Sequence, residues 1–303
     1  MATALSKAQI EAAIRPAAAV ELTAEGVLAA ALPGKGAAPV YAFAPLQSGA
    51  LVPGSQEANL RAPEQVAVAL GAALGDVAQR SHAVTLVLPD ACVRVFVLDF
   101  DSLPPKAADV IPVLRFRLRK MVPFDVEHAG VSYQILTETK TECRALIAVT
   151  PGAILTEYEA AVRAAGFEPG AVLPSSLAAL AALDTEEPAL IACLGPATLT
   201  TAITHGQDLL LYRTVELPND PAQRLGEVQR DIAVAAAYFE DKLGMKAAKL
   251  HYAGPRTAED FARWLNEPDL SVIELAARPS TGAATTLGKL SFAGIAGALA
   301  GAA

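Results

Sequence analysis

The sequence predicts an α/β protein in which one structural unit occurs twice and a small α+β domain is inserted into the first copy. Two observations lead to this prediction. Three strand-like segments, a helix and a fourth strand follow one another near the N-terminus, and the same order returns after residue 188. Between the two copies lie a strand, a helix, two strands and a second helix. A repeated order of elements indicates a duplicated fold.

Apolar periodicity places the elements of the first copy. Runs of β-branched and small apolar residues bounded by turn residues predict four strands, at 17–22, 26–32, 39–46 and 83–89. Residues 62–80 carry apolar side chains at helical spacing, which predicts a helix before the fourth strand. The segment 167–183 follows the insert and is expected to return the chain to the first copy.

The second copy repeats this order. Strands are predicted at 189–195, 196–204, 208–217 and 248–254, with Gly206 in a hairpin turn and a long helix at 220–244 that ends at Gly244. Three antiparallel strands, a helix and a further strand, twice over, are the plan of a duplicated actin-like, or ribonuclease-H-like, fold. The predicted domains are a first half (1–91 and 167–188), an insert (92–166) and a second half (189–303).

The insert contains a cluster of cations in an acidic chain. Arg115, Arg117, Arg119 and Lys120 stand within six residues. A helix with Asp109 as its N-cap places an apolar stripe on one face, and Pro112 in its first turn. That stripe consists of Val110, Leu114, Leu118 and Met121. The helical wheel divides the cations between two flanks and the outer face, so they form either a solvated rim or a partner-binding edge.

The composition excludes several classes of protein. A hydrophobic content of 53% with 18% charged residues indicates a compact globular protein. The formal charge of −8 disfavours nucleic acid as a partner, because such binding depends on neutralising phosphates. Cys92, Cys143 and Cys193 stand far apart in apolar runs, which predicts buried free thiols, and no His or Cys spacing predicts a metal site.

The two ends of the chain show no membrane signals. Residues 1–16 lack the apolar core of a signal peptide, and 290–303 are too short and too rich in small residues to span a bilayer. We expect the latter to form a buried terminal helix and the protein to be cytoplasmic.

Three runs in the insert resemble one known family. They are Met121-Val122-Pro123-Phe124, Tyr133-Gln134-Ile135-Leu136 and Ala164-Ala165-Gly166-Phe167-Glu168-Pro169. Their order and spacing resemble the central region of the PilM family, actin-like proteins of type IV pilus assembly. The resemblance implies an inserted subdomain like that of FtsA. It also implies a groove that receives the cytoplasmic N-terminal tail of PilN, a single-pass inner-membrane protein. The residues implied to line that groove are Arg115, Arg119, Phe124 and Tyr133.

The nucleotide motifs of actin-like ATPases are degenerate here. The first hairpin reads Glu21-Leu22-Thr23 in place of Asp-x-Gly, and the second reads Cys193-Leu194-Gly195-Pro196 in place of Asp-x-Gly-Gly. The glycine cluster for adenosine reads Ala253-Gly254-Pro255. The remaining candidates for a nucleotide site are Glu21, Thr23, Gly195, Thr198 and Gly254. Hydrolysis is not expected, no catalytic residue or cofactor is assigned, and weak binding of ATP with Mg²⁺ is left open.

The expected function is binding rather than catalysis. The resemblance implies a scaffold at the inner face of the inner membrane, peripheral to the membrane through its PilN-like partner and linked to the pilus platform. Self-association is left open. Two alternatives remain: an active actin-like ATPase of the same machine, and a component of a type II secretion platform.

Overall fold

A computed structural model of the chain describes residues 15–34, 36–78, 82–278 and 290–300. The contacts of these residues form two compact units, the first running up to Leu173 and the second from Pro174 to Ala300. The predicted absence of a signal peptide concerns mainly residues 1–14, which lie outside the described residues. Each unit contains one five-stranded sheet, and the first also contains a smaller sheet of three strands.

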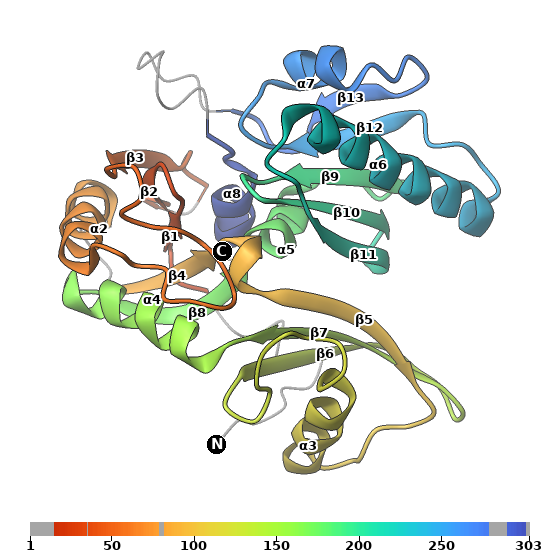
Figure 1. The fold of residues 1–303 in the computed structure, drawn as a ribbon, viewed down its shortest axis with the longest axis horizontal. Coiled ribbons are helices and arrows are strands. Elements are labelled where there is room, and N and C mark those ends of the chain that lie inside the picture. Colours follow the sequence, from red (N-terminus) through yellow and green to blue (C-terminus); the bar gives the residue numbers. More distant parts are fainter. Residues whose placement is uncertain (1–14, 35, 79–81, 279–289, 301–303) are drawn as a thin grey trace. The chain divides into compact units, whose positions relative to one another are not determined.

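The first five-stranded sheet has the order β3-β2-β1-β4-β8 (Figure 1). Its strands are β1 (Ala18–Leu22), β2 (Gly26–Ala31), β3 (Val40–Pro45), β4 (Ala83–Leu88) and β8 (Glu168–Pro174). β1 pairs antiparallel with β2 and parallel with β4. Helix α2 (Pro63–Val77) packs on β1, β2 and β3 through a buried stripe that includes Val66, Leu70 and Leu74. Every residue of β1 and β2 is buried.

The second sheet repeats this order as β11-β10-β9-β12-β13. Its strands are β9 (Ala189–Leu194), β10 (Thr198–His205), β11 (Asp208–Glu216), β12 (Lys249–Ala253) and β13 (Ser271–Glu274). Helix α6 (Pro221–Leu243) packs on β9 and β10, and α7 (Ala258–Leu265) packs on β13. Asp220 caps α6 by accepting a hydrogen bond from the Gln223 amide, and Gly244 ends it in the left-handed conformation, at φ +67°. The identical strand orders confirm the duplicated fold predicted from the sequence.

The fifth strand of each sheet was not predicted from the sequence. β8 follows the insert, and β13 consists of only four residues. Both stand at a sheet edge, where fewer side chains are buried and the apolar pattern is correspondingly weak. Strand β13 is recognisable only because it pairs in parallel with β12.

The insert folds as a three-stranded antiparallel sheet with the order β5-β7-β6. Its elements are β5 (Arg94–Phe100), α3 (Ala107–Leu118), β6 (Gly130–Glu138), β7 (Cys143–Thr150) and α4 (Gly152–Ala164). A short 3-10 turn, η1 (Asp90–Cys92), leads into β5. Figure 1 shows α3 against this sheet, apart from α2 and α4, which pack on each other. The strand–helix–strand–strand–helix order is the predicted one.

Helix α3 begins earlier than predicted. It starts at Ala107 with Lys106 at the N-cap, so the prediction of Asp109 as N-cap was wrong. Pro112 consequently stands inside the helix rather than in its first turn. Val110, Leu114 and Leu118 are buried as predicted, and each such side chain contributes roughly 1.5–3 kcal/mol to folding.

The C-terminal end of α3 also differs from the prediction. The helix ends at Leu118, so Arg119 is the C-cap and Lys120 and Met121 lie beyond the helix. The chain then tightens, with the amides of Met121 and Val122 both donating to the Leu118 carbonyl. This turn rotates the chain, so that Val122 is buried and Met121 is 38% exposed, contrary to the predicted stripe.

Residues 174–188, assigned to the first half from the sequence, have their contacts in the second unit. They form α5 (Ser175–Ala179) and the 3-10 turn η2 (Leu180–Ala182), and both pack on α8 (Ala293–Ala300). The approach is close, since a Cβ on Gly297 would lie 1.8 Å from the Ala178 carbonyl oxygen. Helix α8 is the buried terminal helix predicted from the sequence.

Buried free thiols were predicted for the three cysteines. The three cysteines are free and buried, as predicted. No helix in the described part of the chain combines the length and the apolar character required to cross a membrane.

Candidate functional site

The two arginines predicted to line a peptide groove, Arg115 and Arg119, both bond to the turn that follows α3. The Arg115 guanidinium donates to the carbonyl oxygens of Val126 and Glu127, and at 3.0 Å to that of Ala129. Arg119 forms an ion pair with the Glu127 carboxylate. Both side chains therefore hold residues 126–129 against the helix, which is a structural role for each of them.

The two aromatic candidates, Phe124 and Tyr133, are half-buried against the core of the insert. Phe124 stands in the turn after α3, and Tyr133 lies on β6 opposite Ile147. Burial raises the pKa of the Tyr133 hydroxyl above its ordinary value. All four candidates thus belong to the insert, and their role in binding a peptide stays a prediction.

The first hairpin turn, between β1 and β2, uses its polar groups internally. The amide of Thr23 donates to the Gly26 carbonyl at 2.9 Å, and the Thr23 hydroxyl donates to the same oxygen at 3.0 Å. Glu21 is buried within β1, opposite Leu28. Gly26 is required by packing, because a Cβ there would lie 2.5 Å from the Ala44 carbonyl oxygen and from the Phe43 ring. Its missing side chain makes room for β3.

The second hairpin turn, between β9 and β10, is closed in the same way. The Gly195 amide donates to the Thr198 carbonyl at 2.8 Å, and the Gly195 carbonyl accepts from Arg224 at 2.8 Å. Thr198 is buried. Pro196 has no amide hydrogen to offer. The backbone groups of Gly195 are thereby occupied within the unit.

Gly254, which stands where the glycine cluster for adenosine is expected, directly follows β12 beside the second hairpin. A Cβ on Gly254 would overlap the Tyr252 ring, with 2.2 Å to its Oη atom. That ring stacks on Phe261 at a centroid distance of 4.0 Å. The glycine is therefore explained by the position of Tyr252.

Three arginines that sequence reasoning missed gather near the ends of β9 and β12. Arg278 donates to the Gly254 carbonyl at 2.8 Å and pairs with Glu274 at 3.0 Å, and the Arg256 guanidinium lies 5.0 Å from the centre of the Trp264 ring. Burial lowers the pKa of the Arg224 guanidinium, and the positive charge of Arg256 lowers it further. The sequence carries no signal for this cluster, since its members come from three separate segments.

Three residues of the predicted nucleotide set lie in the second unit and two in the first. β9 and β12 are parallel neighbours, with Cys193 opposite Ala253. Gly195, Thr198 and Gly254 therefore lie close together at the same end of these inner strands. Glu21 and Thr23 belong to the first unit. Within the described ranges, no group of three or more His, Cys, Asp or Glu side chains is placed to hold a metal ion.

The sequence finds no match among protein-family models or among curated proteins. The fold does. A chain of the solved PilM–PilN type IV pilus biogenesis complex superposes with a TM-score of 0.73 at 17% sequence identity, over 96% of this chain and 99% of that chain. This chain has a PilM-like fold.

A second solved structure shares the fold less closely. The cytoplasmic domain of EpsL, an inner-membrane component of the type II secretion system of Vibrio cholerae, superposes with a TM-score of 0.51 at 15% identity, over 87% of this chain and 89% of that chain. The PilM-like fold includes the inserted subdomain, because the match to the PilM–PilN structure extends over nearly the whole of both chains. The resemblance seen in the three sequence runs is thus confirmed at the level of fold.

Proposed function

We propose that this protein is a cytoplasmic scaffold of a type IV pilus assembly machine, and that it binds the N-terminal cytoplasmic tail of a PilN-like inner-membrane protein. The observation that supports the proposal is the superposition on the PilM–PilN structure, at 96% and 99% coverage with no missing subdomain. The lower TM-score with the EpsL domain, 0.51 against 0.73, favours a pilus over a type II secretion platform.

The proposal can be tested by titrating the purified full-length protein into fluorescently labelled peptides. These peptides would be the N-terminal tails of single-pass proteins encoded beside its gene. We expect one tail to bind in the micromolar range, and a scrambled peptide of the same composition not to bind. Failure of every tail at high micromolar concentration would contradict the proposal.

Two variants locate the binding surface. Arg119→Gln removes an exposed, ion-paired arginine from the insert, and Arg263→Gln does the same on α7 of the second unit, where Arg263 pairs with Asp260 at 2.5 Å. If the insert receives the tail, only the first substitution weakens binding. Equal effects of the two substitutions would argue against the insert as the binding surface.

We also propose that the protein does not hydrolyse ATP. The contacts in the two units support this: the Gly195 amide is bonded to Thr198, while Gly26 and Gly254 are required by packing. These residues do not fit the glycine-rich cradle that an Mg²⁺–ATP complex needs. We expect millimolar ATP with Mg²⁺ to leave the melting temperature unchanged and to release no phosphate; a rise alone would show binding, whereas phosphate release would favour the active ATPase.

A further inference from the structure

The outer face of α3 presents apolar and cationic side chains that the insert itself does not use. Val113, Phe116 and Arg117 are exposed residues of α3 at i, i+3, i+4 spacing, and the exposed Lys120 follows in the turn after the helix. Phe116 is 77% exposed and Val113 is 37% exposed. Lys106 is the exposed N-cap residue of α3, and we call Lys106, Val113, Phe116, Arg117 and Lys120 together the outer face of α3.

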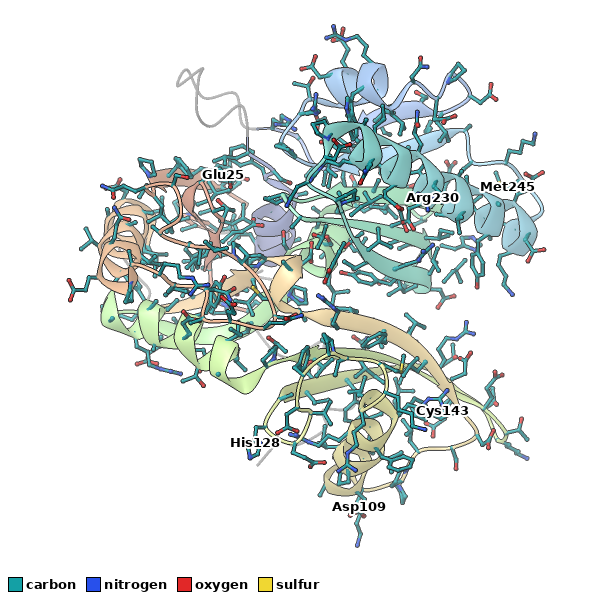
Figure 2. The ribbon with its side chains drawn as sticks, in the orientation of Figure 1. Glu25, Asp109, His128, Cys143, Arg230 and Met245 are labelled. Carbon is teal, nitrogen blue, oxygen red and sulfur yellow. The ribbon has the colours of Figure 1, made fainter. Side chains whose placement is uncertain are left out.

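The cations of this face differ from those on the other side of the helix. Arg115 and Arg119 are engaged by the 126–129 turn. Among the residues that the structure describes, no ion pair engages Lys106, Arg117 or Lys120. Lys106, Arg117 and Lys120 outnumber Asp109 of the same helix, so the outer face of α3 has a net positive formal charge although the chain carries −8. Figure 2 shows Asp109 at the N-terminal end of α3 and His128 on the turn that Arg115 and Arg119 hold.

The size and shape of the face indicate what it contacts. Val113 and Phe116 together offer far less than the roughly 800 Å² per partner that a stable protein interface buries. A single helix is convex and offers no groove for a peptide. A lipid bilayer needs no complementary shape, and an aromatic ring flanked by Lys and Arg is the composition found at the boundary between headgroups and acyl chains. Long cationic side chains can reach phosphates while the ring enters the interface.

We propose that the outer face of α3 makes a direct contact with an anionic lipid bilayer. Phe116 enters the interfacial layer, and Lys106, Arg117 and Lys120 face the phosphates of the headgroups. The rest of this acidic chain is repelled by such a surface, so the contact is weak by itself and is strengthened when a membrane-bound partner holds the protein nearby. The contact does not require that partner, and its test is therefore independent of the peptide titration.

The test is sedimentation of the purified full-length chain with vesicles. One set would contain phosphatidylglycerol and phosphatidylethanolamine, and the other only phosphatidylcholine. We expect binding to the anionic set alone, decreasing steeply as salt is added because the attraction is between charges across water. The double variant Phe116→Ser/Lys120→Glu should lower the partition at least about tenfold, since it removes the ring and reverses one cation.

A matched control exists at the end of α6. Met245 is 52% exposed and is followed by Lys246, so Met245→Ser/Lys246→Glu makes the same change of polarity and charge elsewhere (Figure 2). This variant should bind anionic vesicles as the unsubstituted chain does. Equal losses in both double variants would contradict the proposal, because the attraction would then reflect net charge alone.

A fluorescent label shows whether position 116 itself enters the bilayer. The three native cysteines are buried, so a polarity-sensitive dye will react selectively with Phe116→Cys. A blue shift of its emission on anionic vesicles is expected, and an unchanged spectrum would overturn the proposal. A blue shift without vesicles that grows with protein concentration would show that a second copy covers this face, which also overturns it.

Discussion

Asp231 shows how a single buried residue fixes a helix onto its sheet. It stands on α6 and is only 4% exposed. Its carboxylate accepts a hydrogen bond from Thr201 on β10 at 3.0 Å and pairs with Arg213 on β11 at 2.8 Å. Thr201 and Arg213 are opposite each other in the sheet, so one side chain ties the helix to both strands. Burial nevertheless raises the pKa of Asp231, because desolvation opposes the charged form more than these partners favour it.

This raised pKa predicts the direction in which the free energy of unfolding changes with pH. With its pKa raised in the folded state, Asp231 binds its proton more tightly there than in the unfolded chain. The free energy of unfolding therefore falls as pH rises from the ordinary carboxyl pKa to the raised one. Asp231→Asn should remove this part of the slope, measured by urea unfolding at a series of pH values. Asp241→Asn on the exposed side of the same helix is the control, and equal slopes in both variants would show the account of Asp231 to be wrong.

At the scale of elements, α3 is defined as much by the turn after it as by its own sequence. The helix contributes three buried apolar residues, and the turn contributes Val122, Val126 and Ala129 to the same core. Arg115 connects the two through its bonds to three turn carbonyls. Carbonyl groups left unpaired when an arginine is removed weaken the local structure.

We therefore expect Arg115→Met to lower the free energy of unfolding by roughly 1–3 kcal/mol, since it keeps an apolar stem but removes the donors. Arg117→Met, two residues further on the exposed side, should change it by less than about 0.5 kcal/mol. Hydrogen exchange of residues 122–131 should speed up only in the first variant. Similar effects of the two substitutions would mean that the bonds of Arg115 contribute little.

At the scale of the whole molecule, a polar contact ties the insert to the first half within one unit. Glu157 on α4 accepts hydrogen bonds from the amides of Asn59 and Leu60, at 3.0 and 2.5 Å. The buried Asn59 side chain in turn accepts from the Tyr158 hydroxyl at 3.1 Å and from the Cys92 thiol at 3.0 Å. Burial raises the pKa of Cys92 to about 11, so this thiol stays protonated and acts as a donor.

Removing the Glu157 carboxylate should loosen this connection. We expect Glu157→Ala to cost roughly 1.5–3 kcal/mol, because a charged acceptor of two backbone amides is lost. Glu159→Ala on the same helix removes only an ion pair with Arg163 on the surface and should cost about 0.3–0.5 kcal/mol. Limited proteolysis at residues 51–61 reports the effect directly, and protection equal to that of the unsubstituted chain would contradict the expectation.

The predicted site illustrates how far sequence reasoning reaches. The degenerate hairpins and the cation cluster of the insert were found because each lies in one short run of residues. The arginines at 224, 256 and 278 were missed because they come from separate segments and meet only when β9, β12 and the chain after β13 are in place. A helical wheel likewise could not show the hydrogen bonds of Arg115, because their acceptors lie in the turn after the helix.

By itself the sequence determined the repeated order of strands and helices, the position of the insert and the buried stripe of α3. These follow from apolar periodicity, a local property that the chain carries before it folds. Only the tertiary structure decided where α3 ends, why Gly26 and Gly254 have no side chain, and which cations remain on the outer face. Each of these depends on particular packing and hydrogen-bond contacts, near or far in the sequence, and such contacts leave no periodic pattern.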